Sequence, residues 1–240
     1  MPHSIFVSDL HLTPERPRAN ELFFDFTSGA ATQAAALYIL GDLFEYWVGD
    51  DDLEDPFNAW IAGALNALSG KGVALYFMHG NRDLLIGRAF AARCGAKLIE
   101  DPTLLDLHGT QTLLMHGDTL CTDDIEYQKF RAYAHDPENQ RRFLAQSLAE
   151  RKQKMLGMRA QSEKSKQDKA ADIMDVTPAR VEKVLRESGY PRLIHGHTHR
   201  PARHALVVDG RACERWVLTD WYGRAGYLRC DAAGCTAEPL

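Results

Sequence analysis

Five short apolar runs in the sequence each end in side chains that can ligate a metal ion. The ligand-bearing stretches are Asp9-Leu10-His11, Gly41-Asp42, Gly80-Asn81, His116-Gly117 and His197-Thr198-His199. Their donors are carboxylate, imidazole and amide without thiolate, a mixture that suits Mn, Fe or Zn better than a soft metal. Seven ligands exceed what one ion needs, but they can hold two ions if one carboxylate bridges them. Two such ions, about 3.5–4 Å apart, bind both the attacking and the leaving oxygen of an in-line displacement. The sequence therefore predicts a two-metal phosphoesterase.

Each motif taken alone is weak evidence for a metal site. A single Asp-x-His occurs by chance, a Gly-Asp pair often marks a turn, and a histidine at a strand end is usually a satisfied core residue. The prediction depends on five motifs in one chain, each directly after a run of strand length. The candidate ligands are Asp9, His11, Asp42, Asn81, His116, His197 and His199.

The apolar runs alternate with stretches of helical pattern, which is typical of an α/β fold. Strands are expected at 4–7, 36–40, 73–78, 112–115 and 192–194, and helices at about 19–31, 56–69 and 85–94. Further strands are expected at 205–208, 214–219 and 226–230, with a hairpin turn at Asp209-Gly210. In open α/β sheets ligands bind beyond the carboxyl ends of the strands, so the five motifs would meet there.

A polar helical segment from about 123 to 175 interrupts the alternation. Between Arg141 and Lys169 it holds nine basic and three acidic residues, a local charge of +6 on a chain whose net charge is -5. One interpretation is a solvated helical face. The other is a basic helical cap over an anionic site.

Length and composition fit one domain, 1–240, that carries this insertion. The chain has 45% hydrophobic and 25% charged residues and no overall basic excess, so nucleic acid is not an expected partner. No apolar stretch reaches membrane-spanning length. The five cysteines are scattered without a CxxC pair, and we expect free thiols in a reducing cytoplasm.

The ligand motifs, in this order, resemble those of the calcineurin-like metallophosphoesterase superfamily. The resemblance implies a four-layer αββα sandwich, with helices on either side of two packed sheets. It implies a first metal on Asp9, His11, Asp42 and His199. It implies a second metal on Asp42, Asn81, His116 and His197. Asp42 would bridge the two ions, and a hydroxide shared by them would be the nucleophile.

Longer stretches are similar to one family within that superfamily, the UDP-2,3-diacylglucosamine pyrophosphohydrolases of lipid A biosynthesis. These stretches are 38–45, 47–52, 79–83, 115–124, 173–176 and 194–201. The resemblance implies that water attacks the α-phosphate of UDP-2,3-diacylglucosamine and releases UMP and 2,3-diacylglucosamine 1-phosphate. It also implies two Mn²⁺ per chain. The enzyme would be a monomer in the cytoplasm, peripheral on the cytoplasmic face of the inner membrane.

The substrate contacts of this family carry over to seven positions. They are Asn81, Arg82, Asp124, Ser162, Lys166, Lys169 and His197. Position 166 departs from the family, which often has Asn there. Arg82 stands where many superfamily members have a histidine that protonates the leaving group. Arginine stays charged at neutral pH, so Arg82 would instead stabilise phosphoryl charge. We expect Asp42, Arg82 and His197 to be the catalytic residues.

The segment's apolar residues have two open interpretations, an acyl-chain cleft or packing of the cap onto the domain. Asp118 would either orient His116 or cap a turn. Asp50, Asp51 and Asp52 are interpreted as a solvated loop, and no tryptophan is assigned to the site.

Two other functions stay open. The chain could be a calcineurin-like enzyme that acts on nucleotides or nucleic acids, although it lacks the histidine after Asn81 and a long basic face. It could also be a non-enzymatic scaffold, although such proteins usually lose ligands and this sequence keeps all seven.

Overall fold

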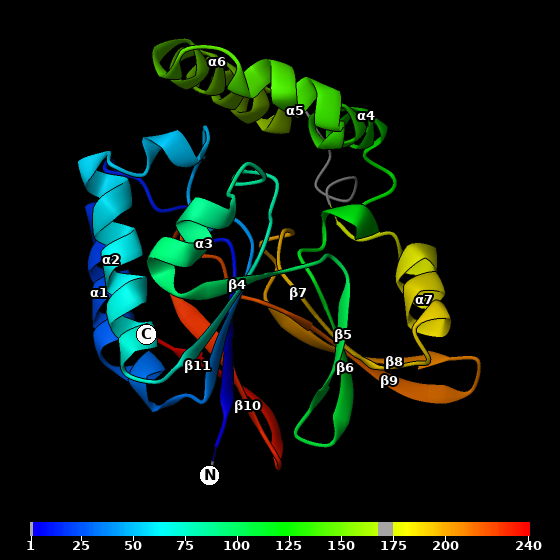
Figure 1. Cartoon of the computed structure of the whole chain (residues 1–240). Coiled ribbons are helices and arrows are strands. Elements are labelled where there is room, and N and C mark those ends of the chain that lie inside the picture. Colours follow the sequence, from blue (N-terminus) through cyan, green and yellow to red (C-terminus); the bar gives the residue numbers. More distant parts are fainter. Residues whose placement is uncertain (1, 168–174) are drawn as a thin grey trace.

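The computed structural model describes residues 2–167 and 175–240, with the backbone alone over 160–167. Its strands are β1 Ser4–Val7, β2 Ala36–Leu40, β3 Ala74–Met78, β4 Ala96–Ile99, β5 Thr103–Leu107, β6 Thr110–Met115, β7 Arg192–His195, β8 Ala202–Val208, β9 Arg211–Val217, β10 Gly226–Asp231 and β11 Gly234–Pro239. Across the described residues they form a six-stranded sheet, β11-β10-β1-β2-β3-β4, and a five-stranded sheet, β5-β6-β7-β9-β8. The two sheets face each other (Figure 1).

The helices are α1 Pro17–Ser28, α2 Pro56–Gly70, α3 Arg88–Cys94, α4 Ile125–His135, α5 Pro137–Leu144, α6 Leu148–Gln167 and α7 Pro178–Glu187. Proline opens four of them (α1, α2, α5 and α7), where its fixed φ suits the first turn and its missing N–H is not needed. α1, α2 and α3 cover the outer face of the first sheet, and α7 covers the second (Figure 1). The predicted four-layer fold is confirmed.

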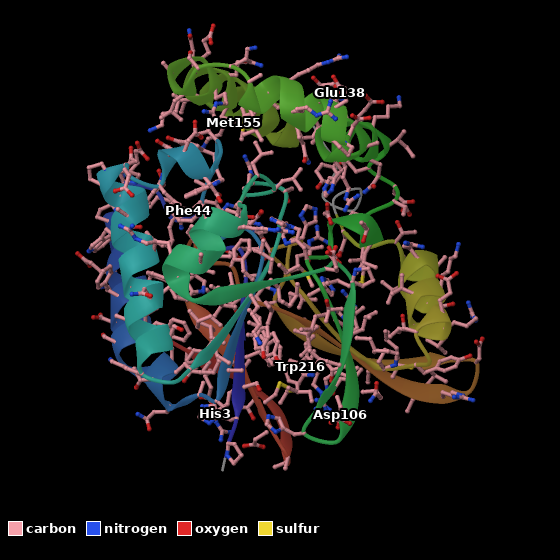
Figure 2. All side chains as sticks on the ribbon, viewed as in Figure 1. His3, Phe44, Asp106, Glu138, Met155 and Trp216 are labelled. Atoms are coloured by element: carbon pink, nitrogen blue, oxygen red, sulfur yellow. A yellow bond between two sulfur atoms is a disulfide. The ribbon has the colours of Figure 1, made fainter. Side chains whose placement is uncertain are left out.

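Three apolar cores separate the four layers. In β1, Ile5 and Val7 pack towards the helices while Phe6 packs between the sheets, because successive strand residues point to opposite faces. The core between the sheets contains Trp216, which Figure 2 shows in that space. The third core joins α7 to the second sheet through Val181 and Leu185. Strands buried on both faces explain the continuous apolar runs in the sequence.

Parallel pairing brings the predicted site to one edge. β1, β2 and β3 are parallel neighbours in the first sheet, and β6, β7 and β9 are parallel neighbours in the second. The carboxyl ends of these strands therefore lie side by side within each sheet. A hydrogen bond from His197 N–H to the Asp9 carboxylate, 2.9 Å, joins the loops of the two sheets.

α4, α5 and α6 form the layer that we call the cap, which lies across this edge (Figure 1). The fully buried Arg151 of α6 fixes the cap to the loop after β2: its guanidinium donates to Val48 O, at 2.5 Å, and pairs with Asp51. Met155, farther along α6, is half-buried and lies on the side of the cap that faces the sheets (Figure 2). No helix among the described residues is long and apolar enough to cross a membrane.

The interpretation of Asp50, Asp51 and Asp52 as a solvated loop is wrong for Asp50 and Asp52, whereas Asp51 is exposed. Asp50 accepts hydrogen bonds from the N–H groups of Gly87, Ala89 and Phe90, so it satisfies the free amides at the start of α3. Asp51 pairs with Arg151 of the cap, and the buried Asp52 pairs with Lys152 at 2.8 Å. Asp51 and Asp52 therefore link the cap to the first sheet, and Asp50 links the loop after β2 to α3.

The expectation of free thiols is wrong for two of the five cysteines. Cys230 and Cys235 form a disulfide. They are direct partners in the antiparallel β10–β11 pair, a register that the sequence did not reveal because β11 was not predicted. Cys94, Cys121 and Cys213 are buried and lie outside this disulfide.

Candidate metal centre

Asp9 and His11 follow β1 in a strained loop. Asp9 has φ 56° and His11 has φ 48°, values that residues with a Cβ rarely adopt. The adjacent β2 loop holds them there, because Asp9 N–H donates to Gly41 O at 3.1 Å and His11 N–H donates to Asp42 O at 2.9 Å. One Asp9 oxygen, Oδ2, accepts from Ser8 and from His197 N–H, which leaves Oδ1 facing the centre.

Asp42 lies in a space that only glycine neighbours permit. A Cβ on Gly80 would meet Asp42 Oδ1 at 2.1 Å, and a Cβ on Gly41 would meet Gly80 Cα at 2.5 Å. The carboxylate of Asp42 lies 3.7 Å from His11 Nε2 and 3.9 Å from His116 Nε2. Asp42 therefore has one candidate ligand on either side of it.

Asn81, His116 and His197 meet on the other side of Asp42. The side-chain oxygen of Asn81 lies 3.1 Å from His116 Nε2 and 2.9 Å from His197 Nδ1. His116 Nδ1 donates to Leu40 O at 2.8 Å, so its Nε2 is oriented towards the centre. The amide and the two imidazoles come from both sheets.

All seven predicted ligands thus lie at the same edge of the fold. Two groups of potential ligand atoms cluster there, Asp9 with His11 and His199, and Asp9 with Asp42 and His116, each with its atoms within 4.8 Å of one another. Within the described structure, the buried atoms Asp9 Oδ1 and His11 Nε2 have no hydrogen-bond partner. Buried polar atoms are nearly always satisfied, and a cation would satisfy both. The residues therefore fit a divalent metal centre.

Charge in the metal-free centre is unevenly distributed. Burial raises the pKa of Asp9, but the neighbouring imidazoles, His199 first among them, outweigh burial and hold it far below its usual range. Burial opposes the charge of His116, yet the carboxylates of Asp42, Asp118 and Asp9 raise its pKa to about 9. Burial and the charge of His116 lower the pKa of His197 to about 4. At neutral pH His197 is thus already neutral, while His116 holds a proton that a metal would displace.

Glu45, a residue that sequence reasoning left without a role, lies buried beneath the centre. Its carboxylate is 3.4 Å from His11 Nδ1 and 3.7 Å from the Arg82 guanidinium. It also accepts from Tyr222 OH at 3.0 Å and pairs with Arg159 of the cap at 3.1 Å. Glu45 therefore links a candidate ligand to the cap. The one sign of this role in the sequence was that Glu45 belongs to the stretch 38–45, which resembles the pyrophosphohydrolase family.

Asp83 was also missed, although it follows Arg82 directly. Its carboxylate, fully buried, accepts from the N–H groups of Gly80, Asp42 and Leu43, at 2.9, 3.2 and 2.7 Å. Burial and the nearby Asp42 raise its pKa to about 6. Asp83 therefore fixes the backbone on both sides of the centre.

Asp118 has a role that neither interpretation anticipated. Its charge raises the pKa of His116, but its carboxylate forms no hydrogen bond with that imidazole among the described residues. Instead it accepts from Tyr127 OH at 2.9 Å and from Arg131 Nε at 2.6 Å, both residues of α4. Asp118 thus attaches the cap to the second sheet, much as Asp51 attaches it to the first.

The predicted substrate contacts have different positions. Asn81, Arg82 and His197 lie at the centre, and the Arg82 N–H donates to Asp42 Oδ1 at 2.8 Å. Asp124 caps α4, accepting from Tyr127 N–H at 3.1 Å. The side chains of Ser162 and Lys166, and all of Lys169, lie outside the described residues.

The fold and the centre define a class of protein. The family model of the calcineurin-like phosphoesterases matches residues 3–201, which include all seven candidate ligands. The chain therefore belongs to the calcineurin-like phosphoesterases, a family that uses divalent metal ions.

Curated relatives narrow the class to one family. A UDP-2,3-diacylglucosamine hydrolase of Aromatoleum aromaticum is 56% identical over 96% of this chain and 94% of its own length. Relatives of the same name in Cellvibrio japonicus and Xanthomonas axonopodis are each 48% identical, over 97% and 99% of this chain and 96% and 98% of their own lengths. Within its class, the chain belongs to the UDP-2,3-diacylglucosamine hydrolase family.

Proposed function

We propose that this chain hydrolyses the pyrophosphate bond of UDP-2,3-diacylglucosamine in lipid A biosynthesis. Water attacks the α-phosphate, and the products are UMP and 2,3-diacylglucosamine 1-phosphate. The observation that carries the proposal is near-full-length identity of 48–56% to relatives named for hydrolysis of this compound. The metal centre supports it, because it offers hydrolytic chemistry at one edge of the fold.

Two Mn²⁺ ions complete the proposed centre. Asp9, His11, Asp42 and His199 would hold the first, and Asp42, Asn81, His116 and His197 would hold the second. When bound, such ions activate water and neutralise charge on phosphate oxygens. The oxygen and imidazole donors suit Mn²⁺, and the unsatisfied Asp9 Oδ1 and His11 Nε2 support the assignment.

Arg82 supplies the positive charge that the protein itself brings to the reaction. Its backbone is fixed on Asp42 and its guanidinium lies near Glu45 with little exposure, 12% of the side chain. A guanidinium cannot act as a general acid at neutral pH, but it binds phosphate oxygens in a fork and stabilises their developing charge. A phosphate leaving group needs less protonation than an alkoxide, which suits cleavage of a pyrophosphate.

The cap is the proposed binding place of the acyl chains, as part of a single domain, 1–240, with the insertion at about 123–175. Its described helices expose large apolar side chains, namely Ile125, Phe130, Tyr133, Leu144, Leu156 and Met158. These side chains would also give the monomer a peripheral contact with the cytoplasmic face of the inner membrane.

The decisive experiment measures UMP release from UDP-2,3-diacylglucosamine by metal-stripped protein, before and after adding Mn²⁺. UDP-N-acetylglucosamine and bis-p-nitrophenyl phosphate serve as comparison substrates. We expect Mn-dependent release from the acylated substrate only. Activity on the generic diester alone would move the function to another branch of the class, and metal binding without any activity would favour the scaffold interpretation.

Asp42→Ala tests the shared carboxylate. Because the variant removes a ligand from both proposed metal positions, we expect loss of metal loading and of activity together. Metal analysis after gel filtration and the UMP assay provide the two measurements. Near-normal turnover in this variant would overturn the two-metal centre.

A further inference from the structure

A cleft of about 410 Å³ opens beside the candidate ligand His199 and has no role in the proposed reaction so far. Its walls come from the loop after β7, the facing parts of β8 and β9, and the loop before β10. They include Thr198, Arg200, Ala202, Arg215 and Arg224. No described residue of the cap lines it. The volume lies in the range of small-molecule sites.

Arg215 is the unusual side chain of this cleft. Its exposed fraction is 8%. The carboxylate of Asp175, in the same wall, pairs with Arg200 and attracts Arg215 from beyond ion-pair distance. Its Nη1 donates a hydrogen bond to His195 Nε2 at 3.1 Å. His195 accepts there because its Nδ1 donates to Gly196 O at 2.8 Å. Burying a charged donor group is costly unless acceptors meet it. Arg215 is therefore held in place with N–H groups left over for a ligand.

A second buried group in the same wall lacks a partner. The hydroxyl oxygen of Thr198 is buried and bonds nothing among the residues that the structure describes. Arg200 is paired with Asp175, whereas Arg224 adds an exposed positive charge at the rim. The cleft thus offers one fixed guanidinium and one hydroxyl, a pair that suits a ligand rich in carbonyl and hydroxyl oxygens.

Position decides which part of the substrate these groups meet. His199 lines the cleft and belongs to the metal centre, so the cleft begins where the α-phosphate would bind. Two arms leave that pyrophosphate, an acylated sugar and a nucleoside. The acyl chains need an extended apolar surface, and the large exposed apolar side chains lie on the cap. The cleft has only the small apolar residues Pro201, Ala202 and Val217, set among charged and polar side chains, which suits a nucleoside better than an acyl chain.

We propose that the cleft around Arg215 and Thr198 is the binding site of the uridine arm of the substrate. Arg215 donates to a uracil or ribose oxygen, and Thr198 exchanges a hydrogen bond with the same arm. The inference rests on the proposed function, because only that reaction places a uridine on the α-phosphate. Arg215 would therefore contribute to the affinity for the nucleotide, whereas the cap would bind the acyl chains.

The test is calorimetric titration of both products into Mn-loaded protein. Arg215→Gln should weaken binding of UMP about tenfold or more, the effect of losing a charge-assisted hydrogen bond. Binding of 2,3-diacylglucosamine 1-phosphate should stay within about twofold. Arg211→Gln is the matched control, since it removes the same charge from the same strand, β9, outside the cleft. That variant should bind UMP as the wild type does.

Ala202→Trp provides a second test that leaves Arg215 and His195 untouched. The side chain at 202 is exposed on β8 and lines the cleft, so a large ring there fills the space without opening the core. UMP binding should again fall while the lipid product still binds. Unchanged UMP affinity in both variants overturns the proposal, and so does an equal loss for both products.

A parallel titration with inorganic phosphate separates a nucleoside site from a general anion site. If Arg215→Gln weakens phosphate as much as UMP, the nucleoside assignment is wrong. The proposed function fails on a different result, namely no turnover of UDP-2,3-diacylglucosamine by wild-type protein that still binds UMP through Arg215. If the wild type turns over UDP-2,3-diacylglucosamine but its affinity for UMP does not depend on Arg215, only the proposal for the cleft is rejected.

Discussion

At the scale of single residues, the candidate centre is made of strained backbone. Five of its seven ligands have φ between 48° and 69°, in the left-handed region, and each such residue costs about 1–3 kcal/mol. They are Asp9, His11, Asp42, His197 and His199. Hydrogen bonds between loops, such as Asp9 N–H to Gly41 O, hold the strain in place. The ligand types were visible in the sequence, whereas this geometry depends on loops 30 to 190 residues apart and was not.

Arg82→Ala tests the division of work within the centre. The variant removes the charge that we propose to act on the reacting phosphate, and it leaves every candidate ligand intact. We expect kcat to fall about 100- to 1,000-fold with metal content unchanged. Steady-state kinetics beside metal analysis would measure both. The kcat of Arg82→Lys, which keeps the charge without the forked guanidinium, should lie between those of the wild type and Arg82→Ala. Loss of metal from Arg82→Ala would contradict the assignment of Arg82 to phosphate charge.

Metal binding should release a proton at neutral pH. In the metal-free protein the pKa of His116, raised to about 9, keeps its imidazole charged at pH 7. That proton stabilises the metal-free fold fully below pH 6.5, and the contribution disappears as the pH rises through about 9. Mn²⁺ must displace it, so binding weakens as the pH falls. Calorimetric titration of Mn²⁺ at pH 7, in buffers of different ionisation enthalpy, measures how many protons are released on binding. We expect the wild type to release about one proton more than His116→Gln. Equal values would place the proton elsewhere.

At the scale of elements, each strand and helix that the sequence predicted has a counterpart in the structure, whereas some further elements were not predicted. β1 and β2 match their expected bounds because continuous apolar runs are unambiguous in a doubly covered sheet. β4, β5, β11 and α7 were missed. β5 and β11 are edge strands with mixed composition, and they pair only because a neighbouring strand is already in place.

One of the side chains that anchor the cap is the buried Arg151. Arg151→Met removes the guanidinium that bonds Val48 O and Asp51, and it leaves Asp51 without its partner. We expect a loss of about 2 kcal/mol in unfolding free energy, less than for a fully buried pair because Asp51 is 59% exposed. Thermal unfolding measures this, with a decrease in Tm of roughly 4–8 °C.

Arg142→Met is the matched control for the cap. Arg142 is 72% exposed and pairs within α5, with Glu138, so its loss should change Tm by less than about 1 °C. Activity on the acylated substrate should also fall in Arg151→Met and persist in Arg142→Met. Equal effects of the two variants would show that the cap is not anchored at Arg151.

At the scale of the whole molecule, the centre lies at the junction of two sheets. Asp9, Asp42 and Asn81 follow strands of the first sheet, and His116 and His197 follow strands of the second. Sequence motifs and resemblance predicted this set of ligands. They did not predict Glu45, Asp83 or Asp118, because a buried carboxylate has a role only through the partners that folding brings to it. The Cys230–Cys235 disulfide was missed because only the folded β10–β11 pair brings the two cysteines together.

Removal of the metal should therefore loosen the whole fold. Ions bound by ligands from both sheets stabilise the native state by about 2.7 kcal/mol at 100 times their Kd. For a chain of this size that corresponds to roughly 5–10 °C in Tm. Differential scanning calorimetry with chelator and then with Mn²⁺ would show the difference. In Asp42→Ala the addition of Mn²⁺ should change Tm very little. A change in Tm equal to that of the wild type would indicate that the metal binds elsewhere.

The spread of the ligands along the chain has a consequence for synthesis. His199 is the last of the seven, and the backbone of Asp9 still accepts a hydrogen bond from Trp221 N–H, at 3.1 Å. The ribosome must therefore add residues as far as Trp221 before Asp9 has all these neighbours. Until His199 is in place the seven candidate ligands cannot meet, so we expect no complete metal centre in a nascent chain that ends before it.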